Sequence, residues 1–209
     1  MVMRGQFLER ATVIPASGGV LEALSHRGSR APPLLIVPPP PGSGGMDSNV
    51  GAELAWAVTR AGHATLRFNF RGVGASPGRP GNRESQAGDV EAALRVLESN
   101  VASAAIAVAA LGDSAETLLD VAAAQPGLVG LALVSPGRLD AAALGRLRRP
   151  LLVVLGEAEP LFSSATSASV AEAGGTLVVV PAADARFVRN LSEVGRAVVR
   201  WLSDLIPSG

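Results

Sequence analysis

The segment Ala110-Leu-Gly-Asp-Ser-Ala-Glu-Thr117 is where the residue types and spacing of this sequence point most directly to chemistry. A run of small apolar residues precedes it and an apolar-periodic segment follows it, which predicts a strand-to-helix turn with Ser114 at its apex. A serine so placed can act as the nucleophile in acyl transfer. The GxSxG pattern of such turns needs tiny residues on both sides, because the strand and helix backbones nearly touch. Gly112 and Ser114 fit the pattern, whereas Glu116 stands at the second glycine position.

A structural interpretation of the same segment competes with the catalytic one. Asp113 and Glu116 have the spacing of a capping box, in which an N-cap side chain and an acid three residues later satisfy the first N–H groups of a helix. Ser114 would then belong to the start of the helix.

The composition limits the classes of function. The 209 residues include 18 Lys plus Arg, 18 Asp plus Glu, two histidines and no cysteine. The balanced charge argues against a nucleic-acid partner or an anionic membrane, and the missing cysteines exclude disulfides, thiol nucleophiles and thiolate metal sites. We expect no cofactor and no metal. Charged Arg4, Glu9 and Arg10 stand where a signal peptide needs an apolar core, and no apolar run has membrane length, so we predict a cytoplasmic protein.

Alternating strands and helices predict a single α/β domain over residues 1–209. Continuously apolar strands indicate a mostly parallel sheet with helices on both faces, and an antiparallel hairpin precedes it. The predicted strands are 6–14, 20–27, 33–37, 64–70, 104–111, 128–134, 151–155 and 176–180. The predicted helices are 48–61, 84–98, 115–124, 141–148, 163–173 and 191–205, the last with an apolar stripe typical of packing.

Two strings carry a resemblance to a known family. The string Ala64-Thr-Leu-Arg-Phe-Asn-Phe-Arg-Gly-Val-Gly-Ala-Ser-Pro-Gly78, with Gly44-Gly-Met-Asp-Ser-Asn49 before the first helix, resembles small bacterial α/β-hydrolases that read LRFNFRGVGxSxG and HPHPxxGGxM. The resemblance spans about Gln6 to Leu205 and implies an α/β-hydrolase fold. Because only one short helix fits between the strands ending at Val134 and starting at Leu151, we expect no lid domain.

The resemblance also implies where a catalytic triad would lie. Ser114 takes the nucleophile position. Glu159 in Gly156-Glu-Ala-Glu159 takes the acid position, where the family reads GxxD. The base is expected in a string like GADHFF, but this chain reads Ala182-Ala-Asp-Ala-Arg-Phe187 and has Ala185 there. A serine nucleophile needs an imidazole to accept its proton, so the triad is degenerate.

Neither histidine can take the vacant position. His26 ends the second strand, which runs antiparallel to the others in this fold, and His63 precedes the fourth strand. Both are therefore expected at the opposite edge of the sheet, about 15 to 20 Å from Ser114 at about 3.3 Å per strand residue. We interpret them as ordinary surface or strand-end histidines.

Oxyanion stabilisation is also incomplete in the sequence. One donor would be the N–H of Ala115, and the other would come from the loop Pro38 to Pro41, where Pro38 and Pro40 replace the histidines of HPHP. Proline has no N–H to donate.

We interpret the loop that begins at Arg71 as a tight connection between a strand and a helix, although the Arg71 side chain could point into the pocket.

Four acidic residues can ring the same pocket: Asp113, Glu116, Glu159 and Asp184. They could hold a metal, but carboxylates scattered over three loops are more often solvated or paired, for instance Glu159 or Asp184 with Arg186.

Three functional hypotheses follow. The first is an α/β-hydrolase-fold protein that has lost serine-hydrolase catalysis and binds a partner protein, its own copy or a small ligand in the remnant pocket. The second is a weak serine esterase or acyl hydrolase that uses Ser114. The third is a subunit of an assembly that docks through an edge strand or through the helix Leu191 to Leu205.

Overall fold

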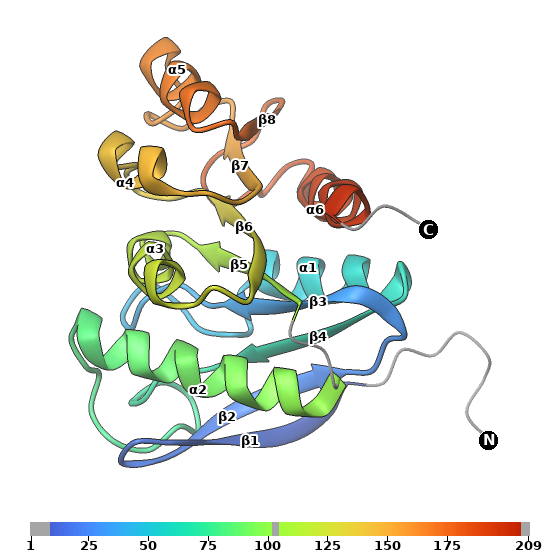
Figure 1. Cartoon of the computed structure of the whole chain (residues 1–209), viewed down its shortest axis with the longest axis vertical. Helices are drawn as coiled ribbons and strands as arrows, with labels where there is room; N and C mark the ends of the chain where they lie inside the picture. The colour runs from blue at the N-terminus through green and yellow to red at the C-terminus, as the bar shows by residue number, and fades with distance from the viewer. Residues whose placement is uncertain (1–8, 102–104, 206–209) are drawn as a thin grey trace.

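The computed structural model describes residues 9–101 and 105–205, and within these ranges the chain forms eight strands and six helices (Figure 1). The strands are β1 (Arg10–Ala16), β2 (Gly19–His26), β3 (Arg30–Val37), β4 (His63–Phe68), β5 (Ile106–Leu111), β6 (Leu128–Val134), β7 (Leu151–Gly156) and β8 (Thr176–Val180). The helices are α1 (Asn49–Arg60), α2 (Arg83–Val101), α3 (Ser114–Ala124), α4 (Ala141–Arg146), α5 (Ser164–Glu172) and α6 (Leu191–Leu205).

All eight strands join one sheet in the order β1-β2-β4-β3-β5-β6-β7-β8. The hairpin β1–β2 is antiparallel, β2 runs antiparallel to β4, and the remaining pairs are parallel. Strands β4, β5 and β7 are buried along their whole length, as sheet strands covered on both faces must be. The predicted mostly parallel sheet with an N-terminal antiparallel hairpin is confirmed.

Two apolar cores lie on the two faces of the sheet. Helices α1 and α6 cover one face, and α2, α3, α4 and α5 cover the other (Figure 1). The predicted packing stripe of α6 is confirmed, because Val194, Val198 and Trp201 are buried against the sheet and α1. Only α4 separates β6 from β7, so the expected absence of a lid insertion at that point is confirmed as well.

Two element bounds inside the described ranges differ from the prediction by three residues. Helix α2 extends to Val101, and β3 begins at Arg30, which pairs with His63 before an irregularity that ends at Leu34. The predicted first strand began at Gln6, and residues 6–8 lie outside the described ranges, as does Ala104 of the predicted fifth strand. In the part of the chain that the structure describes, no helix has the length and apolar character needed to cross a bilayer.

Candidate functional site

A cavity of about 500 Å³ opens at the carboxyl edge of the parallel strands, where the loops after β3, β5, β6 and β8 meet. Ligands of open α/β sheets bind at this edge. Its apolar wall includes Pro39, Pro40, Val50, Leu111 and Val134. The polar or charged lining residues are Ser43, Ser48, Asn49, Asp113, Ser135 and Arg186.

Ser114 does not line this cavity. It is the first residue of α3, its exposed fraction is 0%, and its hydroxyl donates to the Pro38 carbonyl oxygen at 2.6 Å. The turn residue with a left-handed backbone is Gly112, at φ +59°, and Gly112 does line the cavity. The hydroxyl proton of Ser114 is therefore committed inside the protein.

The predicted capping box is wrong. Asp113 has φ −67° and ψ −9°, and its side chain makes no capping hydrogen bond. Its carboxylate packs instead against the backbone of Gly137, at the cavity wall. Glu116 points away from the turn and forms ion pairs with Arg83, at 2.6 Å, and with Arg138. The hydrogen bond from Arg138 is the main reason why the pKa of Glu116 lies below its usual value.

Glu159, at the acid position, is 7% exposed and fully engaged. One carboxylate oxygen accepts the N–H of Gly156 at 2.6 Å, and the other accepts the hydroxyl of Ser135 at 2.7 Å. Ser135 lines the cavity and has a left-handed backbone, φ +49°, which is uncommon for a residue other than glycine. Sequence reasoning missed Ser135, although its place directly after a buried strand at this edge was a usable signal.

Ala185, at the base position, also lines the cavity, so the loop after β8 lies where the resemblance placed it. The neighbouring Asp184 carboxylate accepts the backbone N–H groups of Arg186 and Val188, at 3.1 and 3.2 Å. The predicted ion pairs of Arg186 with Glu159 or Asp184 are not formed; Glu159 accepts from Ser135 and Gly156, and Asp184 accepts from backbone N–H groups. Within the described ranges, no three potential ligands converge on a metal position.

The remaining predicted pocket residues divide into two groups. Pro40 lines the cavity. Ala115 is buried and its N–H donates to the Gly112 carbonyl at 3.1 Å, so that N–H is not free to face the cavity. Arg71 points toward α2 and binds the fully buried Asp89 carboxylate, at 2.5 Å to Oδ1.

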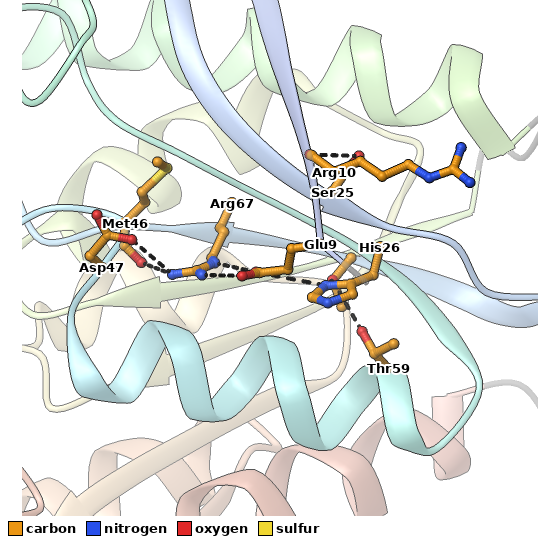
Figure 2. A network of polar contacts seen from close by, with 9 residues as sticks. Glu9, Arg10, Ser25, His26, Met46, Asp47, Thr59 and Arg67 are labelled. Atoms are coloured by element: carbon orange, nitrogen blue, oxygen red, sulfur yellow. Dashed lines mark hydrogen bonds and ion pairs between the residues drawn. The ribbon is translucent and has the colours of Figure 1, made fainter. Parts of the chain in front are cut away.

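Both histidines lie at the opposite edge, as predicted: His26 ends β2 and pairs in register with Thr65, and His63 begins β4. They are not surface residues, however, since His26 is 9% exposed and His63 is 0% exposed. The Nδ1 atom of His26 lies 3.2 Å from Thr65 Oγ1, beside the Glu9–Arg67 ion pair shown in Figure 2. The Nδ1 atom of His63 lies 2.8 Å from the Pro32 carbonyl. Burial lowers the pKa of both imidazoles.

No family model matches the sequence, and no curated protein matches it. Solved structures do share its fold. A candidate α/β hydrolase of unknown function from Agrobacterium tumefaciens superposes with a TM-score of 0.80 at 21% identity, covering 96% of this chain and 100% of that chain. An α/β serine hydrolase homologue from Coxiella burnetii gives 0.79 at 28% identity, covering 96% and 98%. An α/β serine hydrolase without a lid from Xanthomonas campestris gives 0.78 at 22% identity, covering 96% of both chains. The chain therefore has the α/β-hydrolase fold, without a lid.

Proposed function

We propose that this α/β-hydrolase-fold protein has lost serine-hydrolase catalysis and acts by binding a small ligand in the cavity at the carboxyl edge of the sheet. The observation that carries the proposal is the hydrogen bond from Ser114 to the Pro38 carbonyl, made in a side chain that solvent does not reach. A nucleophilic serine must instead donate to a base and reach the substrate.

The chemistry around the cavity supports the same conclusion. An imidazole base is missing, because the side chain of Ala185 has no proton acceptor and both histidines lie at the other edge of the sheet. Pro40 cannot donate an N–H to an oxyanion. Acyl transfer needs each of these functions, whereas binding needs only a shaped, accessible cavity, and about 500 Å³ falls within the usual range for small-molecule sites. A protein partner, self-association and a cytoplasmic location remain predictions from the sequence.

The alternative is a weak serine esterase that uses Ser114. It has some support, because proteins of similar structure are described as serine hydrolases. It would require Ser114 to leave its hydrogen bond with Pro38 and α3 to rearrange at its first residue.

Two assays on the purified protein distinguish these functions. We expect no turnover of short p-nitrophenyl esters above the level of Ser114→Ala, and no labelling by a fluorophosphonate probe. Ester turnover that disappears in Ser114→Ala, together with probe labelling at Ser114, would establish the esterase and refute the loss of catalysis.

A further inference from the structure

The backbone between β5 and α3 turns at Gly112. Among residues 110–116, all of which the structure describes, Gly112 alone has a positive φ, +59°. Ser114 already belongs to the helix. In a hydrolase of this fold the nucleophile occupies the sharp, strained turn itself, so that its side chain stands exposed above the sheet. The backbone conformation expected of the nucleophile is therefore found two residues before Ser114.

The residues on either side of Gly112 satisfy the packing rule for this turn. Two positions before it is Ala110 and two positions after it is Ser114, and the exposed fraction of each is 0%. Both are small, as the close approach of strand and helix requires. With Ser114 as the apex, the second flanking residue would be Glu116, whose side chain is 28% exposed and paired with two arginines. Placing the apex at Gly112 removes this exception.

The space above Gly112 is open. A Cβ built on Gly112 meets no atom within 4 Å apart from those of its two chain neighbours, and Gly112 and Asp113 line the cavity while Ser114 does not. The N–H of Ala115, which follows Ser114, donates to the Gly112 carbonyl and so cannot serve as an oxyanion donor in this geometry. A side chain at position 112 would project into the same cavity that Ala185 and Pro40 line.

We propose that residue 112, rather than residue 114, occupies the nucleophile position, and that this chain has a glycine there. Ser114 is then one of the two small flanking residues of the turn. The assignment rests on the proposed function in one respect, that Ser114 is not a nucleophile. It adds that the nucleophile, the base and one oxyanion donor are each replaced, by Gly112, Ala185 and Pro40, around one intact cavity.

Thiol labelling tests the assignment without any catalytic readout, because the chain has no cysteine of its own. The variants are Gly112→Cys, Ser114→Cys and Gly174→Cys. Gly174 is the matched control, since it also has a left-handed backbone, φ +68°, with no atom within 4 Å of a built Cβ, and it lies just after α5. Each folded variant is treated with an aromatic disulfide reagent at pH 8.

We expect Gly112→Cys to react within about tenfold of the rate of Gly174→Cys. Ser114→Cys should react at least about 100-fold more slowly, because its thiol becomes accessible only when the structure opens. A fast Ser114→Cys or a slow Gly112→Cys overturns the assignment. So does a Gly112→Cys variant that fails to fold while Gly174→Cys folds, because position 112 would then lack the open space that the structure gives it.

A second measurement asks whether position 112 faces the vacant base position. Adding Ala185→His to Gly112→Cys should lower the pH of half-maximal alkylation, since a neighbouring imidazolium favours the thiolate. Adding Ala185→His to Gly174→Cys should leave that pH unchanged. An equal alkylation profile with and without Ala185→His in the Gly112→Cys background overturns the assignment. Hydrolysis by the natural chain would refute the proposed function without changing either labelling result.

Discussion

The hydroxyl of Ser114 donates to a buried carbonyl, and its removal should reduce stability. In Ser114→Ala the buried Pro38 carbonyl loses the donor at 2.6 Å, so we expect the free energy of unfolding to fall by about 1–2 kcal/mol. Urea unfolding measures the change. Ser99→Ala is the control, because the Ser99 hydroxyl bonds to Arg95 on an exposed helix surface and its loss should cost less than about 0.5 kcal/mol. Equal stability of Ser114→Ala and the natural chain would contradict this role.

Arg71 serves the fold rather than the cavity, through its ion pair with Asp89. The carboxylate of Asp89 is fully buried and accepts hydrogen bonds from the Arg71 side chain and backbone N–H. Asp89→Asn keeps the shape but leaves the guanidinium without its counter-charge, and we expect a loss of about 2–4 kcal/mol in the free energy of unfolding.

The exposed pair of Glu193 and Arg196 on α6 provides the comparison for Asp89. Glu193→Gln should change the free energy of unfolding by less than about 0.5 kcal/mol in the same urea titration. If Asp89→Asn costs no more than Glu193→Gln, Arg71 does not depend on the buried carboxylate.

Residue types alone could not show that the Ser114 side chain is buried. The letters Gly-Asp-Ser fit a nucleophile turn centred on Ser114, and they fit equally a turn centred on Gly112. The backbone torsion and the burial of each residue are the grounds for our proposal that the turn is centred on Gly112, and both depend on how α3 packs on the sheet. By contrast, the family resemblance implied pocket positions for Pro40 and Ala185, and both residues line the cavity.

At the scale of elements, α1 and α3 begin in different ways. The Ser48 hydroxyl oxygen accepts the Gly51 N–H at 3.2 Å and so caps α1, whereas the Asp113 side chain caps nothing. We expect Ser48→Ala to reduce the free energy of unfolding by about 1 kcal/mol and Asp113→Ala to change it by less than about 0.5 kcal/mol. Thermal or urea unfolding of the two variants, side by side, gives the comparison. A larger loss in Asp113→Ala would restore the capping-box interpretation.

The elements themselves were predictable, because their patterns are strong. Continuous apolar runs produced the buried strands, and the stripe of Val194, Val198 and Trp201 produced the packing face of α6. The exact ends of the strands depend on contacts with distant segments, and a local sequence pattern does not reveal those contacts. The early start of β3 at Arg30 follows from pairing with His63, which lies on a separate strand.

At the scale of the whole molecule, topology determined which edge holds each residue, but not how deeply each is buried. The antiparallel direction of β2 placed His26 away from the cavity. Its surroundings come from separate parts of the chain, since its Nδ1 atom lies 3.2 Å from Thr65 Oγ1 on β4 and 3.8 Å from the Glu9 carboxylate, which pairs with Arg67 (Figure 2). A local sequence pattern carries no information about such distant coverage.

The two buried histidines should make the whole fold sensitive to mild acid. Burial lowers the pKa of His26, with Glu9 opposing and Arg67 adding to the effect, and burial lowers the pKa of His63, with the Pro32 carbonyl opposing and Arg30 adding. In the unfolded chain both imidazoles have a pKa of about 6.5. The unfolded state therefore binds more protons below that pH, and the stability that is fully present above about pH 6.5 is lost as the pH falls toward the folded-state pKa values.

Urea unfolding at pH 7.5 and at pH 5.5 should show this loss of stability. Ordinary carboxylates, with pKa values of about 4, are still ionised at pH 5.5. His26→Gln/His63→Gln should show a smaller loss over the same interval, whatever its stability at pH 7.5. Stability that stays constant or rises from pH 7.5 to 5.5 in the natural chain would mean that the imidazoles are protonated as easily in the fold as outside it.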